Sequence, residues 1–137
     1  MRILLVGSGG REYAIAQKLY QENSDSDLYF LPGSDSMQQF GKCVDLNPLE
    51  VDLVADWATK EKIDLVIIGP EGPLVAGLAN RCSDQGLKVF GHDQSTSLLE
   101  GSKSFAKNFM KKYQIPTAVS YDISEWSAGE SVIAHWP

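Results

Sequence analysis

A glycine-rich turn near the N-terminus, Gly7-Ser8-Gly9-Gly10, is the segment of this chain best suited to chemistry with a phosphate group. Glycines let the backbone approach a ligand closely, and the free N–H groups at the start of a helix favour an anion. Arg11 follows at once, where a cation opposes the helix dipole at a cost of about 0.3–1 kcal/mol. Because a bound anion would offset that cost, we predict a phosphate-bearing small molecule at this turn. The alternative is that Arg11 points into solvent.

The same turn lacks two features of a nicotinamide dinucleotide site. The dinucleotide fingerprint places a third glycine where this chain has Glu12, and that glycine brings helix and strand together. The next expected strand, 28–31, is followed by Pro32-Gly33-Ser34 instead of an acidic residue that would bind a ribose hydroxyl. The sequence therefore disfavours a nicotinamide cofactor.

Glu71 stands in a second turn built from glycine and proline, Gly69-Pro70-Glu71-Gly72-Pro73. A carboxylate held in such a rigid turn could accept hydrogen bonds from sugar hydroxyls or from an amine. It could equally complement the dipole of a helix that we expect to start near Pro73. The local sequence leaves both interpretations open.

These turns follow apolar runs that we expect to be strands. The expected strands are 3–6, 28–31, a weak one at 43–44, 65–68 and 88–90. Helical patterns lie between most of them. This alternation predicts an α/β fold with a doubly wound, mostly parallel five-stranded sheet and helices on both faces. In such sheets ligands bind outside the carboxyl ends of the strands, which is where the glycine turns fall.

Three helices are expected between these strands. Residues 13–21 place Ile15, Ala16, Leu19 and Tyr20 on one helix face. A second helix should begin with Asn47 as N-cap and Pro48 in the first position. It should carry toward the sheet the apolar residues Val54, Trp57, Ala58 and Ile63. A third helix, 74–83, should be closed by Gly86.

Beyond Gly91 the pattern changes. The expected elements are helices 94–100 and 102–113, broken at Gly101, and a strand near 118–121. Residues 122–137 show no clear period. Lys103, Lys107 and Lys111 recur every four residues, a spacing typical of a solvated helix face, and that is our interpretation of Lys107 and Lys111.

Composition excludes several classes of protein. The net charge of −6, with no large Lys/Arg cluster, argues against a nucleic-acid surface. No apolar run reaches the ~18–20 residues of a membrane span, and no signal peptide precedes the first strand. We interpret Cys43 and Cys82 as buried thiols in a reducing cytoplasm. His92 and His135 are isolated, so we expect no metal site.

An ordered set of segments extends over most of the chain. They are Gly7–Glu12, Pro32-Gly33, Asp64–Glu71, Pro73–Gly77, Gly86–Gly91, Leu99–Lys107, Phe109-Met110 and Ile115–Thr117. In this set the chain closely resembles the phosphoribosylamine–glycine ligases, also called glycinamide ribonucleotide synthetases. A single glycine turn would be a weak signal, whereas this ordered series is specific.

The resemblance implies the N-terminal part of an ATP-grasp ligase of purine synthesis. That family joins glycine and 5-phosphoribosylamine with ATP, giving glycinamide ribonucleotide, ADP and phosphate. Residues 1–100 would form the Rossmann-like domain that binds the phosphoribosyl substrate. Residues 101–121 would begin the ATP-grasp region, and 122–137 match nothing in the family. ATP and Mg would serve the full-length enzyme, together with the ATP-grasp and C-terminal domains that are missing here.

The resemblance also implies which residues form the site. The substrate-binding residues would be Gly9, Gly10, Arg11, Glu12, Pro32, Gly33 and Glu71. Glu71 would lie near the ribose or its amine, and the others near the phosphoribosyl group. Lys103 resembles the lysine that reaches the nucleotide phosphates in ATP-grasp enzymes. The catalytic residues are not indicated.

The chain also departs from the family pattern. Tyr13 stands where histidine is usual, and Ser34 where asparagine is usual. The lysine- and glycine-rich segment and the magnesium carboxylates are absent, so we expect no tight binding of ATP or Mg and no catalysis by this chain alone. Two alternatives stay open: a stand-alone module that binds a phosphosugar or nucleotide, and an ATP-grasp relative with another acceptor.

Overall fold

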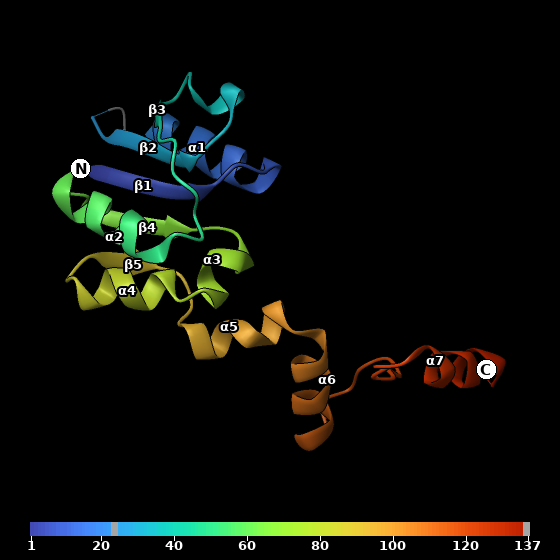
Figure 1. The fold of residues 1–137 in the computed structure, drawn as a ribbon. Coiled ribbons are helices and arrows are strands. Elements are labelled where there is room, and N and C mark those ends of the chain that lie inside the picture. The colour runs from blue at the N-terminus through green and yellow to red at the C-terminus, as the bar shows by residue number, and fades with distance from the viewer. Residues whose placement is uncertain (23–24, 136–137) are drawn as a thin grey trace. The chain divides into compact units, whose positions relative to one another are not determined.

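The apolar run at the N-terminus forms the central strand of a parallel sheet (Figure 1). The computed structural model describes residues 1–22 and 25–135, and within them five strands lie in the order β3-β2-β1-β4-β5. Their bounds are β1 Arg2–Gly7, β2 Asp27–Pro32, β3 Lys42–Cys43, β4 Leu65–Ile68 and β5 Lys88–Phe90. All of the pairings are parallel. The predicted fold class is confirmed, and so are the five strands predicted before Gly91, with β3 one residue earlier than predicted.

Helices cover both faces of the sheet because side chains along each strand alternate between two apolar clusters. One cluster joins Ile3, Leu5 and Phe30 to α1 (Gly10–Glu22) through Ala16. The other joins the alternate strand residues to α2 (Val51–Lys60) and α4 (Leu78–Asp84). The other helices between residues 1 and 101 are η1 (Asp35–Met37), α3 (Glu71–Val75) and α5 (Gln94–Gly101).

The second helix begins later than predicted. The Asn47 side chain caps a tight turn instead of a helix, because its Oδ1 accepts the N–H of Leu49 at 3.0 Å and its carbonyl accepts that of Glu50 at 3.0 Å. The helix therefore starts at Val51. It ends at Lys60, where Lys62 adopts a left-handed conformation (φ 57°). The Ile63 N–H then returns to the Ala58 carbonyl at 2.9 Å, so Ile63 reaches the core from outside the helix.

The predicted helix 74–83 is in fact two helices. Gly77 adopts a left-handed conformation (φ 93°) that an α-helix cannot contain, and it separates α3 from α4. The first of the two begins at Glu71, earlier than the start near Pro73 that the sequence suggested. Gly86, also left-handed (φ 81°), closes α4 as predicted.

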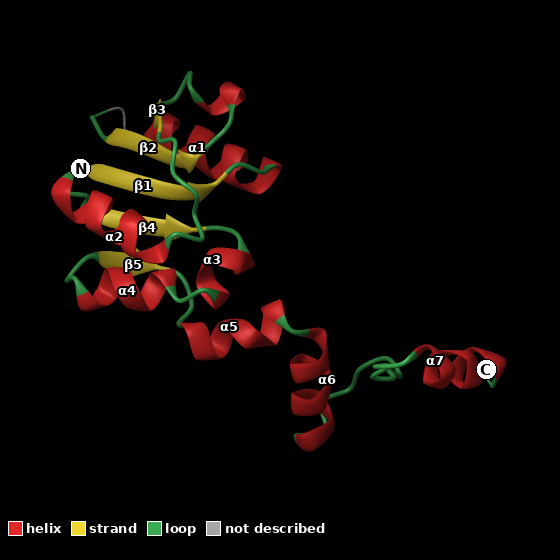
Figure 2. Cartoon of the chain, viewed as in Figure 1, coloured by secondary structure: helices red, strands yellow, loops and turns green. Residues whose placement is uncertain are grey.

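The chain divides into two compact units, Met1–Gly101 and Ser102–Pro137. The second unit contains α6 (Lys103–Lys112) and α7 (Trp126–Ala134), joined by a loop (Figure 2). Ser102 caps α6 by accepting the Phe105 N–H at 3.3 Å, which explains the predicted break at Gly101.

Two predictions for this unit are wrong. No strand forms at 118–121, because this segment lies against α6 instead of pairing with a sheet. The tail contains a helix that its sequence period did not reveal, α7, in which Trp126 Nε1 donates to Glu130 Oε1 at 2.8 Å. Within the described ranges, no helix is both long and apolar enough to cross a lipid bilayer.

Candidate functional site

The loops that follow β1 and β2 border one cavity at the carboxyl edge of the sheet. Gly7 and Pro32 are paired in the parallel register of the two strands, so the loops leave the sheet as neighbours. The cavity has a volume of about 280 Å³ and is lined by Ser8, Gly9, Gly10, Tyr13, Ser34 and Ser36. Every lining residue is uncharged, and four of them carry a hydroxyl group. The cavity is therefore rich in neutral hydrogen-bond donors.

The Pro32-Gly33 turn places Ser34 at this cavity. Gly33 is left-handed (φ 74°), and a Cβ there would lie 2.6 Å from Cys43 Sγ and 2.8 Å from Phe30 Cβ. Only glycine fits both requirements. The Leu31–Pro32 peptide bond is cis. Ser34 and Ser36 then bring their Oγ atoms to 3.0 Å from each other.

Glu12 is buried directly behind the glycine turn. Its side chain is 5% exposed, its Oε2 accepts the Gly9 N–H at 2.9 Å, and its Oε1 lies 2.9 Å from Arg11 Nε. Glu12 is the third residue of α1, and a glutamate at this position commonly bonds back to the residue before the helix. The sequence-predicted residues Gly9, Arg11 and Glu12 are thus in direct contact.

Arg11 lines a different cavity from the hydroxyl-lined one. This second cavity, of about 470 Å³, lies beside the ends of β4 and β5, and its charged or ionisable lining residues are Arg11, His92 and Glu100. The hydrogen bond and charge of Glu12 raise the pKa of the Arg11 guanidinium above its ordinary value, and the charges of Glu100 and Glu71 act in the same direction. The Arg11 side chain is 57% exposed, so it can reach a ligand from solvent.

Glu71 is the first residue of α3 and is exposed. A carboxylate in the first turn of a helix is favoured by the helix dipole. The interpretation of Glu71 as a residue that complements this dipole is therefore compatible with its position. The Glu71 carboxylate makes no hydrogen bond to the described residues of the site. Its negative charge acts on Arg11. An interaction with a ligand therefore remains available to it.

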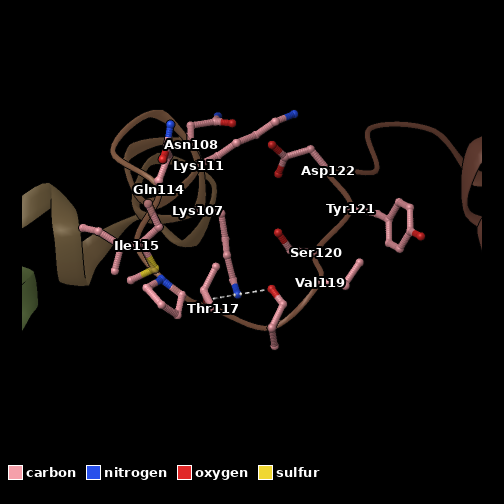
Figure 3. Close-up of a pocket in the computed structure, with 13 residues that line it drawn as sticks. Lys107, Asn108, Lys111, Gln114, Ile115, Thr117, Val119, Ser120, Tyr121 and Asp122 are labelled. Carbon is pink, nitrogen blue, oxygen red and sulfur yellow. Dashed lines mark hydrogen bonds between the residues drawn. The ribbon is translucent and has the colours of Figure 1, made fainter.

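Lys103 and Lys107 both lie on α6 in the second unit, with different surroundings. Lys103 is exposed in the first turn. Lys107 is half-buried, and its Nζ donates to Thr117 Oγ1 at 2.7 Å and to the Ala118 carbonyl at 2.8 Å (Figure 3). The interpretation of Lys107 as part of a solvated face is therefore wrong, because two loop oxygens lie within its reach. Lys111 is exposed, as expected.

Lys107 and Lys111 both line a cavity of about 660 Å³ within the second unit. Its other walls are the end of α6 and the loop 114–122 (Figure 3). In the ranges 1–22 and 25–135, no three His, Cys, Asp or Glu side chains gather closely enough to bind a metal ion.

Sequence reasoning missed four side chains of the hydroxyl-lined cavity: Ser8, Tyr13, Ser34 and Ser36. The available signal was their position, since Ser8 lies inside the glycine turn and Ser36 lies two residues after Ser34. Tyr13 directly follows Glu12, and both Tyr13 and Ser34 differ from the usual residues of the family pattern. The Tyr13 ring also packs on Phe40 at 5.5 Å between centroids, which fixes its orientation.

Comparison with known proteins gives a consistent result. Residues 1–100 match the family model described as phosphoribosylglycinamide synthetase, N domain. A phosphoribosylamine–glycine ligase from Clostridium acetobutylicum is 46% identical over 118 residues, which cover 86% of this chain and 28% of the relative. One from Caldanaerobacter subterraneus is 43% identical over 117 residues, with 85% and 28% covered. The chain thus spans less than a third of the length of these relatives.

Solved structures agree with the sequence relatives. The crystal structure of a phosphoribosylamine–glycine ligase from Thermotoga maritima superposes with a TM-score of 0.62 at 28% identity, covering 87% of this chain and 26% of that one. An N5-carboxyaminoimidazole ribonucleotide synthetase from the same organism has a TM-score of 0.67 at 16% identity, which shows a shared fold alone.

Proposed function

Since this chain belongs to the family of phosphoribosylglycinamide synthetase N domains, we propose that it is the substrate-binding part of a phosphoribosylamine–glycine ligase. The complete enzyme would join 5-phosphoribosylamine and glycine with ATP to give glycinamide ribonucleotide, ADP and phosphate. The names of its relatives support this reaction. Residues 1–100 would bind the phosphoribosyl substrate, and residues 101–121 would begin the ATP-grasp region.

The hydroxyl-lined cavity is the observation that carries this proposal. The first i→i−4 hydrogen bond of α1 runs from Tyr13 N to Gly9 O at 2.9 Å, so the preceding N–H groups of the helix have no partner inside it. Gly10, which supplies one of them, lines the cavity. Neutral hydroxyl and amide donors at a helix start are suited to a phosphate group.

The size of the cavity indicates which part of the ligand it would hold. Its volume of about 280 Å³ lies just below the range of about 300–1,000 Å³ that is typical of sites for whole drug-sized ligands. We therefore assign it to the phosphate end of the substrate. The ribose would then extend along the carboxyl edge of the sheet, toward the loop after β4.

Arg11 and Glu71 would act on the rest of the ligand. Glu71 is exposed and could accept hydrogen bonds from ribose hydroxyls or from the reacting amine. Arg11 interacts electrostatically with Glu71 and could balance the charge of a bound anion. Pro32 and Gly33 would serve by holding the second loop in place.

The described residues do not fit a complete site for Mg-ATP, because no acidic cluster that could hold the metal is present among them. When bound to the complete enzyme, Mg-ATP would supply the phosphoryl group that activates glycine. Lys103 is our candidate for contacting nucleotide phosphates. We expect this chain to be inactive alone.

Calorimetric titration with glycinamide ribonucleotide tests the proposal, with ribose 5-phosphate and NAD as comparison ligands. We expect saturable binding of the ribonucleotide that is weakened by Arg11→Ala and by Glu71→Ala. Lys18→Ala and Glu22→Ala, which remove exposed charges at the far end of α1, are the matched controls and should bind as the parent chain does. Binding of NAD in preference to the ribonucleotide, or no binding of the ribonucleotide, would overturn the proposal.

A further inference from the structure

Glu12 occupies a space between two neighbouring strand ends that glycines leave open. A Cβ at Gly7, the last residue of β1, would lie 2.5 Å from Glu12 Cγ and 2.8 Å from Cδ. A Cβ at Gly69, directly after β4, would overlap Glu12 Oε1 and lie 2.8 Å from Cδ. Because β1 and β4 are paired, one side chain touches the loops of both strands.

The contacts of Glu12 also fix one backbone amide of the glycine turn. Its Oε2 accepts the Gly9 N–H at 2.9 Å, so this N–H points inward, away from any ligand in the cavity. A Cβ at Gly9 would lie 2.9 Å from the same oxygen, which shows how closely the turn is held against the carboxylate. Gly10 N–H and the hydroxyl groups of the lining are among the donors left for a ligand.

We propose that Glu12 is a positioning residue of the phosphosugar site, which holds the glycine turn to the end of β4 and does not itself bind the ligand. The part of this proposal that concerns ligand binding rests on the proposed function. The decisive property is the reach of the side chain and an acceptor oxygen at its end, since both are needed to bond Gly9 from between Gly7 and Gly69. The negative charge of Glu12 acts mainly in the ion pair with Arg11, whose side chain is exposed.

Two conservative variants separate reach from charge. Glu12→Gln keeps the length and one acceptor oxygen, whereas Glu12→Asp keeps the charge and is one methylene shorter. We expect the Gly9 amide to exchange its hydrogen about tenfold faster in Glu12→Asp than in the parent, because its hydrogen bond is lost, and at a near-parental rate in Glu12→Gln. This NMR measurement needs no ligand, so it decides the positioning role even if the proposed function fails.

Ligand binding should follow the same order. For glycinamide ribonucleotide we expect the dissociation constant to rise about tenfold in Glu12→Asp and by no more than about threefold in Glu12→Gln. A direct ligand contact through the charge predicts the reverse order. Parental Gly9 exchange in Glu12→Asp, or weaker binding in Glu12→Gln than in Glu12→Asp, would overturn the inference.

Gly69→Ala provides a test that leaves Glu12 itself unchanged. The added methyl group should push the carboxylate away from Gly9 and speed up exchange of the Gly9 amide, as Glu12→Ala should also do. In a Glu12→Ala background it should add little, because the crowded side chain is gone. Gly72→Ala is the matched control, since its Cβ would meet only Leu49 Cδ2, at 3.6 Å. Additive effects of Gly69→Ala and Glu12→Ala would contradict the inference.

Discussion

Gly7 of β1 and Pro32 of β2 are paired across the parallel sheet, and the loop that follows each of them contributes serines to one cavity. Ser8 and Ser34, which are 26 positions apart in the chain, thus deliver hydroxyl groups to the same place. A parallel sheet produces this arrangement without any special sequence between the loops, because all of its strands end at one edge.

The hydroxyl groups of Ser34 and Ser36 should contribute directly to ligand affinity. We expect Ser34→Ala and Ser36→Ala each to weaken binding of glycinamide ribonucleotide by about 1.5–3 kcal/mol if the hydroxyl bonds a charged phosphate oxygen. Calorimetric titration measures this change. Ser83→Ala, an exposed position at the end of α4, should bind as the parent does. Unchanged affinity in both cavity variants would show that the phosphate lies elsewhere.

Gly33 should tolerate no side chain. We expect Gly33→Ala to lower the free energy of unfolding by about 1–3 kcal/mol, because it combines a left-handed backbone with a clash against Cys43 and Phe30. Urea unfolding measures the loss. Gly86→Ala is the matched control, since Gly86 is also left-handed (φ 81°) but faces open space. Equal losses at the two positions would mean that the contact with Cys43 contributes nothing.

The two cysteines should differ sharply in reactivity. Burial raises the pKa of the Cys82 thiol to about 11, whereas Cys43 is only half-buried. The thiolate is the reactive form, so iodoacetamide at about pH 8 should label Cys43 in the folded chain well before Cys82. Mass spectrometry of the labelled chain gives the order, and both residues should react alike in urea. Preferential labelling of folded Cys82 would contradict its burial.

The raised pKa of Cys82 should also make the chain less stable in alkali. The unfolded thiol ionises near about pH 8.5, whereas the folded one ionises at about 11. Between these values the unfolded state binds fewer protons, so the free energy of unfolding should fall as pH rises, by at most about 1.4 kcal/mol per pH unit. Cys82→Ala should remove this part of the slope. An unchanged slope in the variant would exclude Cys82 as its source.

Asp93 should stabilise the start of α5 in a pH-dependent way. Its Oδ1 accepts the Ser95 hydroxyl at 2.6 Å and the Thr96 N–H at 2.9 Å, and these hydrogen bonds lower the pKa of the carboxyl group. A lowered pKa gives stability that is present above the unfolded value of about 3.9 and is lost as pH falls through the folded value. In urea unfolding, Asp93→Asn should be less stable than the parent at neutral pH, and the difference should vanish in acid. A difference that persists in strong acid would refute this role.

The sequence predicted the sheet well because its strands are short apolar runs bounded by glycine and proline. Residues 3–6 and 65–68 are read from local composition alone, and the glycine turn after β1 follows from the same signal. The contact between Glu12 and Gly69 could not be read in this way. It joins residues far apart in the chain, and its only trace is a glycine at the end of each strand.

Two of the failed predictions share one physical cause, which is competition between local hydrogen bonds. Asn47 has the residue type of a helix cap, yet its side chain closes a turn before the helix. Lys107 has the spacing of a solvated face, yet two oxygens of the following loop bind it. In both cases the alternative partner lies close by, and spacing alone does not distinguish the two outcomes.

A two-dimensional NMR titration of the ¹⁵N-labelled chain with glycinamide ribonucleotide locates the proposed site most directly. Saturable shifts should be concentrated in the amides of residues 8–13 and 33–36, which surround the hydroxyl-lined cavity. The amides of residues 86–88, which lie at the amino end of β5 and thus away from the carboxyl ends of the strands, should stay nearly unchanged. Shifts centred on the cavity at 107–122, or no shifts at a saturating excess of ligand, would contradict a phosphosugar site at the ends of β1 and β2.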